Sequence, residues 1–297
     1  DKALDKITDG GTIVLLSNYS GRIVFDKSVT VKCEDGKHFA LTSSYSNYVS
    51  DDVTVTFENL KFTESTQFSR YSSAALGTGS LIFKNCTGSL SIGTGDISNI
   101  TMESSQLSGT IFASNLLTMK GSTFSGKFNT KDFTAESDCT ISCKKNAPSY
   151  ISGTITVPTA TPVKLVPFEN AETGAKLLEV SKNSNTEIAG KFVLTDTSGN
   201  YGIQLSKQFN GSYLCLAQRI TSENGKIAVG YEPQIKHVPN NPAYVSSSGT
   251  GIFTCDATWS KDAAWSVGDT PKLTVTLNAD DFYFFDNSFD VSELQVY

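Results

Sequence analysis

The sequence predicts an all-β protein whose larger part is a right-handed parallel β-helix, a solenoid of short stacked strands, followed by a small C-terminal β module. Three observations carry this prediction. Strand-like segments alternate apolar and polar residues, glycines recur at their corners, and no long stretch has a helical period. Coils this short cannot bury a face alone, so each must stack on its neighbours.

One apolar column repeats through the first half of the chain. Five short segments align so that a charged residue directly follows the column residue, which is Phe57, Phe83, Met102, Met119 or Ala135. The spacing within the column falls from 26 to 16 residues, which is typical of a solenoid. A β-sandwich is the alternative, but this region lacks the Asn-Gly turns expected of its hairpins. The hexapeptide repeat of a left-handed β-helix is also missing, which favours the right-handed form.

The elements follow in order along residues 1–235. Residues 1–7 predict a short amphipathic helix that caps the first coil, because an uncapped coil would expose a strand edge. Residues 9–16, 29–33 and 53–62 predict the first strands of the stack. Four prolines then loosen the pattern, at Pro148, Pro158, Pro162 and Pro167. Strands resume at 177–180, 190–194, 202–205 and 213–216, where we expect looser coils, with a separate small β domain as the alternative.

A second domain is predicted over residues 236–297. Prolines, asparagines and serines between residues 233 and 248 indicate a linker or loop. Beyond it lie a strand-like segment at 251–255, the Trp259 and Trp265 pair, an alternating strand at 271–277 and an acidic, aromatic run at 280–290. These predict a small or truncated β module.

Composition excludes several classes of function. The 297 residues carry a net charge of -6 with 18% charged residues, so nothing attracts the chain as a whole to nucleic acid or an anionic membrane surface. No apolar stretch is long enough to insert into a membrane. The chain begins at Asp1 without an initiator methionine, so we expect a processed chain or a piece of a longer one. We expect it to be monomeric.

The six cysteines predict no metal or cofactor. They lack paired Cys-x-x-Cys spacing, which argues against zinc and iron-sulfur sites. Their even number permits disulfides, yet Cys139 and Cys143 would lie about 13 Å apart on a continuous strand, beyond the reach of a bridge. We therefore predict that most thiols are free and buried.

Catalytic chemistry is thinly supplied, and we predict no catalytic residue. The arginines and histidines lie far apart in the sequence, at Arg22, Arg70, Arg219, His38 and His237, and no Gly-x-Ser-x-Gly element is present. The paired carboxylates Asp51-Asp52 and Asp280-Asp281 are neighbours, which point to opposite faces of a strand. Solvated turn residues explain them better than an acid and base pair.

Three early segments, 9–16, 28–31 and 53–62, resemble the opening coils of pectate-lyase-like β-helix modules in surface proteins of Gram-positive bacteria. Segments 271–277 and 280–290 resemble the Ig-like modules that follow such β-helices. The resemblance implies a right-handed parallel β-helix, a small Ig-like β-sandwich and an extracellular location. The chain lacks the Gly-His-Gly element of polygalacturonases and the clustered carboxylates and basic residue of the lyases, so the family's activity does not carry over.

Ligand binding is more plausible than catalysis. Sugars bind to aromatic faces flanked by polar groups, and residues 43–48 and 67–71 combine both. The candidate ligand-binding residues are Tyr45, Tyr48, Arg70, Tyr71, Trp259 and Trp265. The alternative is an irregular surface loop with packed tyrosines, and tryptophans in the core of the C-terminal module.

The sequence therefore predicts a non-catalytic extracellular β-solenoid that serves as a stalk or adhesion surface of a bacterial cell-surface or secreted protein. Its partner would be a glycan or another ligand on a host surface or cell wall. Two alternatives stay open. One is a polysaccharide-active β-helix enzyme, a lyase or glycoside hydrolase with an atypical site, and the other is a carbohydrate-binding module.

Overall fold

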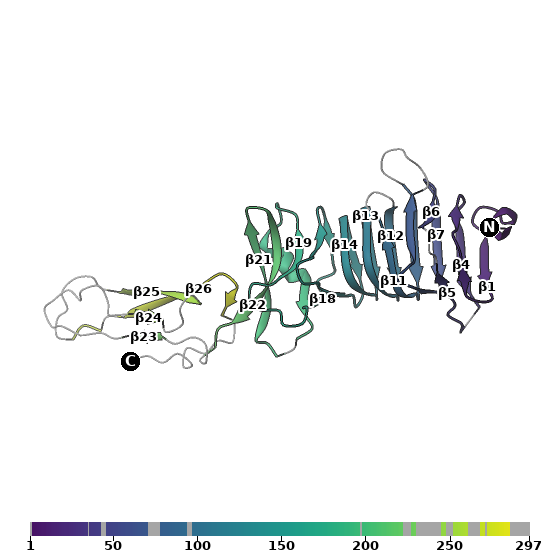
Figure 1. The fold of residues 1–297 in the computed structure, drawn as a ribbon. Coiled ribbons are helices and arrows are strands. Elements are labelled where there is room, and N and C mark those ends of the chain that lie inside the picture. The colour runs from purple at the N-terminus through teal and green to yellow at the C-terminus, as the bar shows by residue number, and fades with distance from the viewer. Residues whose placement is uncertain are drawn as a thin grey trace. The chain divides into compact units, whose positions relative to one another are not determined.

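The computed structural model is all-β, with a long sheet rich in parallel pairs (Figure 1). It describes residues 2–34, 36–42, 46–70, 78–93, 97–196, 198–221, 227–229, 245–247, 252–260, 268–270 and 272–285. Contacts divide the chain into two units. Unit 1 comprises Asp1–Thr197 and Ile203–Cys215, and unit 2 comprises Ser198–Gly202 and Leu216–Tyr297.

The predicted N-terminal helix is confirmed as α1 (Lys2–Lys6). Its apolar residue Leu4 is buried, and the other side chains face outward. The Lys27 ammonium donates hydrogen bonds to the carbonyl oxygens of Leu4 (2.9 Å) and Ile7 (3.2 Å). A cation at the C-terminal end of a helix satisfies carbonyls that have no partner within the helix. This contact fastens the helix to the first coil.

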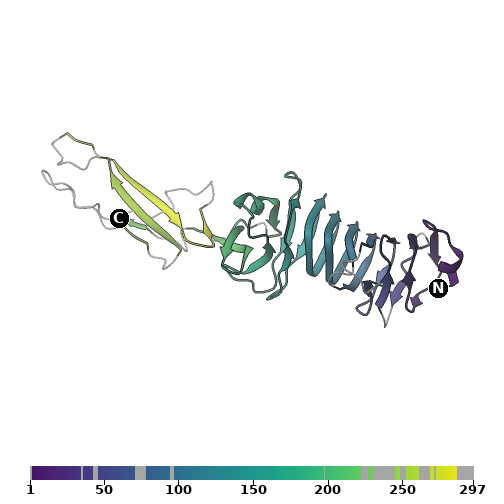
Figure 2. The same ribbon diagram turned by 90° about the horizontal axis from the view of Figure 1, so that it is seen from above.

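One continuous series of parallel strands forms the principal face of unit 1 (Figure 1, Figure 2). In stacking order it contains β1 (Thr12–Leu15), β4 (Val29–Cys33), β7 (Thr54–Glu58), β10 (Ser80–Lys84), β12 (Ile97–Glu103), β13 (Gln106–Lys120) and β14 (Thr123–Glu136). Phe57, Phe83, Met102, Met119 and Ala135 are successive register partners and are all buried. The predicted apolar column is therefore confirmed residue by residue.

Two further series of parallel pairs complete the early coils. One contains β2 (Tyr19–Ser20), β5 (Ala40–Thr42) and β8 (Lys61–Phe62), and the other contains β3 (Val24–Phe25), β6 (Ser46–Val49) and β9 (Gln67–Arg70). Both series continue onto β11 (Thr87–Ile92), which pairs in turn with β13. Each strand thus pairs with the equivalent strand of the next coil, an arrangement compatible with a β-solenoid.

Aromatic rings fill the space inside these coils. The Phe57 and Phe83 rings stack with centroids 5.6 Å apart, and the Phe62 and Phe68 rings pack against both. All four side chains are buried. Burying each ring removes roughly 150–250 Å² of surface from water, so this stack is a major source of stability in the coils.

Glycines are required where the backbones of successive coils touch. Gly109 and Gly126 have φ angles of 116° and 156°. A Cβ atom on Gly109 would lie 2.1 Å from the Leu90 carbonyl oxygen, and one on Gly126 would lie 2.0 Å from the Gly109 carbonyl oxygen. Any side chain would therefore force the coils apart, which explains why glycine recurs in this part of the sequence.

The later coils of unit 1 use shorter strands. Parallel pairing continues through β15 (Thr140–Ser142), β16 (Ser149–Ile151), β17 (Ile155–Thr156), β18 (Val163–Val166), β19 (Lys176–Val180) and β20 (Phe192–Leu194), with the 3₁₀ helix η1 (Thr186–Lys191) before β20. After β21 (Tyr201–Gln208), the strand β22 (Gly211–Arg219) pairs with β19 in the antiparallel sense. Looser coils were expected to continue here, whereas the described strands change from parallel to antiparallel pairing at β22.

Unit 2 contains two antiparallel pairs, β23 (Ile227–Val229) with β24 (Val245–Ser247), and β25 (Phe253–Trp259) with β26 (Leu273–Ala279). The short β27 (Tyr283–Phe284) pairs in parallel with Gln218 and Arg219. Ile220, Ile252 and Phe253 form a small core against which Phe285 packs. Among the described residues, no helix is long and apolar enough to cross a membrane.

Candidate functional site

Tyr48 lies on the outer side of β6, where the sequence predicts a ligand-binding residue. Its neighbour Asn47 is fully buried: the side-chain oxygen accepts a hydrogen bond from the Ile23 amide (3.1 Å), and the side-chain nitrogen donates to the Gln67 carbonyl (3.0 Å). Because strand neighbours alternate between faces, a buried Asn47 turns Tyr48 outward. The Arg22 guanidinium lies 4.5 Å from the centroid of the Tyr48 ring, a cation–π contact.

Arg70, the second predicted residue, is held by an acidic turn residue. Its Nε donates to Asp51 Oδ1 (3.0 Å) and its Nη2 to Asp51 Oδ2 (2.5 Å). Asp51 Oδ1 also accepts a hydrogen bond from the Thr78 amide (3.3 Å). The bond from Arg70 is the main cause that holds the pKa of Asp51 below its ordinary value. Asp51 thus ties together the two residues that flank the segment 71–77.

The structure brings only some of the predicted ligand-binding residues together. Tyr48 and Arg70 lie on the paired strands β6 and β9, with Val49 the register partner of Arg70. Tyr45, Tyr71 and Trp265 lie outside the described residues. Trp259 is the last residue of β25 in unit 2, and its side chain is also outside the described part.

Both pairs of adjacent carboxylates lie outside the strands, in a turn or at a strand end. Asp51 and Asp52 occupy a turn, as the sequence suggests, and Asp51 is committed to Arg70. Asp280 and Asp281 lie where the chain leaves β26. Within the described ranges, no group of three or more His, Cys, Asp or Glu side chains is placed to hold a metal ion.

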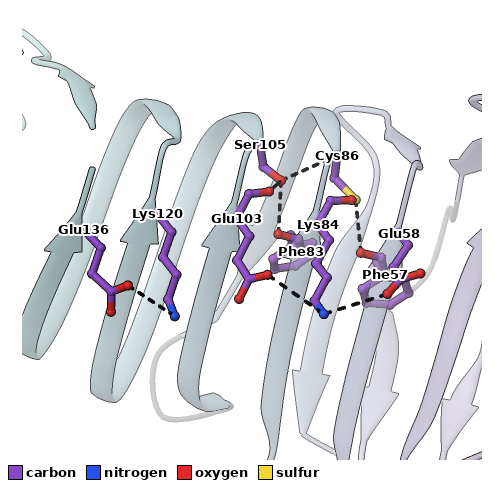
Figure 3. Close-up of polar contacts among 9 residues, drawn as sticks. All are labelled: Phe57, Glu58, Phe83, Lys84, Cys86, Glu103, Ser105, Lys120 and Glu136. Atoms are coloured by element: carbon purple, nitrogen blue, oxygen red, sulfur yellow. Dashed lines mark hydrogen bonds and ion pairs between the residues drawn. The ribbon is translucent and has the colours of Figure 1, made fainter. Parts of the chain in front are cut away.

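A row of alternating charges runs along the principal face, one step beyond the buried column. We call it the charge ladder, and its successive register partners are Lys32, Glu58, Lys84, Glu103, Lys120 and Glu136. The Lys84 ammonium lies 3.9 Å from both Glu58 and Glu103, and the Lys120 ammonium lies 3.5 Å from Glu136 (Figure 3). Sequence reasoning noted a charge after each column residue but missed the alternation of sign.

A second outward row lies beside the charge ladder. We call it the threonine row, and its register partners are Thr12, Thr30, Thr56, Ile82, Thr101, Thr118 and Thr134. Ile82 is half-buried and is the apolar member of the row, and Thr118 is buried. Together the two rows give this face a regular surface of methyl, hydroxyl and charged groups.

Buried polar side chains connect the coils from inside. The Ser105 hydroxyl accepts a hydrogen bond from the Cys86 amide (3.0 Å) and donates to the carbonyl oxygens of Phe83 (3.1 Å) or Glu103 (2.9 Å) (Figure 3). The Cys86 thiol lies 3.4 Å from the Phe57 carbonyl oxygen. Burial raises the pKa of Cys86 to about 12. A thiol held in this neutral form packs and hydrogen-bonds but is a poor nucleophile.

The predicted burial of the cysteines is confirmed for the described thiols. Among the described cysteines, the free and buried thiols are those of Cys33, Cys86, Cys139, Cys143 and Cys215. Burial raises the pKa of Cys143 to about 12 and that of Cys215 to about 11. The side chain of Cys255 lies outside the described part.

A pocket of about 460 Å³ opens beside the antiparallel strand that follows the coils. Its walls include Lys145, Phe168, Lys176, Glu179 and Tyr213. The Lys176 ammonium lies 3.9 Å from the centroid of the Tyr213 ring. Burial, followed by the charge of Glu179, raises the pKa of Tyr213, so its hydroxyl stays protonated at neutral pH. The pocket therefore offers aromatic surface, two ammonium groups and one carboxylate.

A second, more apolar pocket of about 240 Å³ lies at the N-terminal end of unit 1. Its walls include Leu4 of the helix and Val14, Leu16 and Tyr19 from the first coil. Leu16 is 77% exposed. The pocket offers little that could orient a polar ligand.

No family model, curated protein or solved structure matches this chain.

Proposed function

We propose that this chain is a non-catalytic β-solenoid module that serves as a stalk or as an adhesion and ligand-binding surface of a bacterial cell-surface or secreted protein. In this proposal unit 1 is a right-handed parallel β-helix similar to the pectate-lyase-like modules, and unit 2 is a small Ig-like module. The observation that carries the proposal is the parallel pairing of each strand of the principal face with the next, from β1 to β14. Such a stack is suited to spacing and to presenting side chains at regular intervals.

The described carboxylates support a non-catalytic role. Glycoside hydrolysis needs one carboxyl group with a raised pKa as acid and a second carboxylate within about 10 Å as nucleophile or base. The pKa of Asp51 is instead lowered by Arg70. Glu58, Glu103 and Glu136 are each engaged in an ion pair with a lysine of the neighbouring strand.

The ligand surface in this proposal is the outer side of β6 and its neighbours. Tyr48 offers an aromatic ring, and Arg22 covers part of it with a guanidinium whose donors can reach hydroxyl groups. Asp51 and Arg70 fasten the neighbouring turn. A neutral glycan could stack on such a surface with little dependence on salt.

A glycan array combined with a panel of polysaccharide degradation assays tests the proposal. We expect binding without release of reducing or unsaturated sugar from pectin, polygalacturonate or mucin-type glycans, with or without calcium. Changing Tyr45, Tyr48 and Tyr71 together to Ala should weaken binding about tenfold or more, because stacking energy is lost. Tyr150→Ala, a half-buried tyrosine on β16, is the matched control. Sugar release by the pure protein would overturn the non-catalytic role.

A carbohydrate-binding module built around the pocket beside Tyr213 is the other candidate. The pocket beside Tyr213 combines the aromatic side chain of Phe168 with the polar groups of Lys176 and Glu179. Glu179→Gln and Lys176→Ala should then abolish glycan binding while the tyrosine triple variant keeps it. The reverse pattern assigns the ligand to the surface around Tyr48.

A further inference from the structure

The signs of the charges along the charge ladder follow a symmetric order. Ion pairs within one chain do not require this symmetry. From Lys32 to Glu136 its signs run plus, minus, plus, minus, plus, minus over six successive strands. Because the number of charges is even and the signs alternate, the same ladder read backwards carries the opposite sign at every position. A second ladder laid against it in the reverse direction would therefore meet only opposite charges.

We propose that the face carrying the charge ladder and the threonine row binds a second copy of this chain, with the two stacks antiparallel. A two-fold axis that runs along the strand direction, between β10 and β12, places Lys84 opposite Glu103 of the second copy and Glu103 opposite its Lys84. The same axis places Lys32 opposite Glu136. Two-fold interfaces use one surface patch twice, so a patch that complements itself is what such an interface needs.

Charge also selects the orientation of the two copies. If the stacks ran in the same direction with their ladders facing, Lys84 would lie opposite Lys84 and Glu103 opposite Glu103. Like charges placed opposite each other across an interface oppose binding, whereas complementary ones guide it and fix the register. Of the two two-fold arrangements that set the ladders face to face, the antiparallel one is thus the one that the signs permit.

The side chains of the ladder remain available to a partner. Those of Glu58, Lys84, Glu103, Lys120 and Glu136 are between 31% and 52% exposed. Their internal ion pairs, at 3.5–3.9 Å on a solvated surface, each contribute little to folding stability. Lysine and glutamate each keep unused donors or acceptors that a second copy can engage.

The threonine row supplies the contact surface beside the charges. Ile82, its apolar member, lies next to the proposed axis, and Thr101 lies on the other side. The axis thus sets Ile82 of each copy against Thr101 of the other, so that methyl groups meet at the centre of the patch. From β4 to β14 the face spans about 24 Å at the usual spacing of strands. A patch of this length gives a weak interface. Dimers would then form mainly where many copies lie close together on one surface.

Sedimentation equilibrium of the full chain tests the proposal. We expect a dimer that forms with rising protein concentration at about 0.01 M salt and weakens about tenfold or more at about 1 M salt, where the Debye length falls from about 30 Å to about 3 Å. Lys84→Glu alone and Glu103→Lys alone should each weaken dimerisation about tenfold or more. An equal mixture of the two variants should restore it, because each variant then complements the other.

Two controls separate pairing between copies from pairing within one chain. The double variant Lys84→Glu with Glu103→Lys keeps every opposite-charge pair between copies, but it places like charges beside each other within the ladder. We expect it to dimerise like the original chain. Lys164→Glu, on β18, changes a lysine whose side chain is 45% exposed against 44% for Lys84, and it should leave dimerisation unchanged. A chain that stays monomeric at low salt, or a double variant as impaired as the single ones, would refute the proposal.

Discussion

The coils from β4 to β14 and the coils from β15 to β20 both use parallel pairing. They differ in the length of the paired strands and in how similar the residues at paired positions are. In the earlier coils the strands lengthen until β13 and β14 reach 15 and 14 residues, with Phe, Met or Ala stacked in one column. In the later coils β15 and β18 have three and four residues. Long paired strands with similar residues at equivalent positions are therefore followed by short paired strands, which proline-rich segments connect.

The difference shows what holds a stack together. Where strands are long, the residues of the buried column are register partners from coil to coil, and the buried Ser105 hydroxyl accepts the hydrogen bond of the Cys86 amide. Where strands are short, most of a coil lies in connections, and an antiparallel strand, β22, follows the last parallel pairs. We expect the earlier coils to be the more stable part of unit 1.

The largest effect is expected from Phe83→Ala. Phe83 is fully buried and packs against Phe57, Phe62 and Phe68, so its loss removes buried surface and leaves a cavity between coils. The free energy of unfolding of unit 1 should fall by about 3–5 kcal/mol in urea titrations. Phe209→Ala, at a fully exposed site, should change it by less than about 0.5 kcal/mol.

Glu103→Ala is the second control for this prediction. Glu103 follows Met102, the register partner of Phe83, and points outward. Its replacement should also cost less than about 0.5 kcal/mol in dilute protein at high salt. Equal costs for Phe83→Ala and Glu103→Ala would show that the inward and outward positions are assigned wrongly.

A smaller effect is expected from Leu165→Ala in the later coils. Leu165 on β18 is fully buried between Ile141 and Leu194, its register partners. Removing it should cost about 2–3 kcal/mol, at the lower end for buried leucines, because short strands can relax into the cavity. Hydrogen exchange should show the loss of protection confined to β15–β20, with Val193→Ala, which is partly exposed on β20, as the control. Loss of protection spreading evenly to β7 would contradict the comparison.

Ser105→Ala should have an intermediate to small effect. Its hydroxyl accepts the hydrogen bond of the buried Cys86 amide, and removal leaves that amide without its partner. The free energy of unfolding should fall by about 1–3 kcal/mol. Ser105→Cys, which keeps a weaker acceptor in a similar volume, should recover part of the loss. If Ser105→Ala is neutral, the inner polar contacts do not help to hold the coils.

The smallest effect concerns pH and the pair formed by Asp51 and Arg70. The pKa of Asp51 in the folded chain lies below its usual value of 3.8 because Arg70 binds the ionised form. The stabilisation is therefore present above pH 3.8 and is lost as pH falls through the lowered pKa. Arg70→Gln should reduce thermal stability slightly at pH 7, and the difference from the original chain should shrink as the pH falls below 3.8 and through the lowered pKa of Asp51. A constant difference across this range would show that Arg70 acts through packing alone.

The sequence was sufficient to predict the buried column. The alternation of apolar and polar residues indicates which side of a strand faces the core. At Phe57, Phe83 and Met102 it predicts the inward side without knowledge of which coils are neighbours. The N-terminal helix was also predictable, because Leu4 is apolar among charged neighbours.

Other features depended on which coil lies beside which. The alternating signs from Glu58 to Glu136 can be read from the aligned column, whereas Lys32 joins the ladder only when it is placed beside Glu58, 26 residues later in the chain. The same holds for Arg70, whose partner Asp51 lies 19 residues away. The sequence does not predict the antiparallel pairing of β22. Residues 211–217 are buried on both faces of the strand, so their pattern is the same for a parallel and an antiparallel partner.

The most direct test of the account is a distance measured by pulsed electron paramagnetic resonance between spin labels at positions 30 and 134. Both residues belong to the threonine row, 104 residues apart in sequence and five strand spacings apart in the stack. Labels attached through unnatural keto side chains leave the native thiols unchanged. The parallel stack predicts a single narrow distance distribution centred at about 24 Å, from five strand spacings of about 4.8 Å. A distribution centred far from that value, or a broad one without a peak, would contradict the in-register stack.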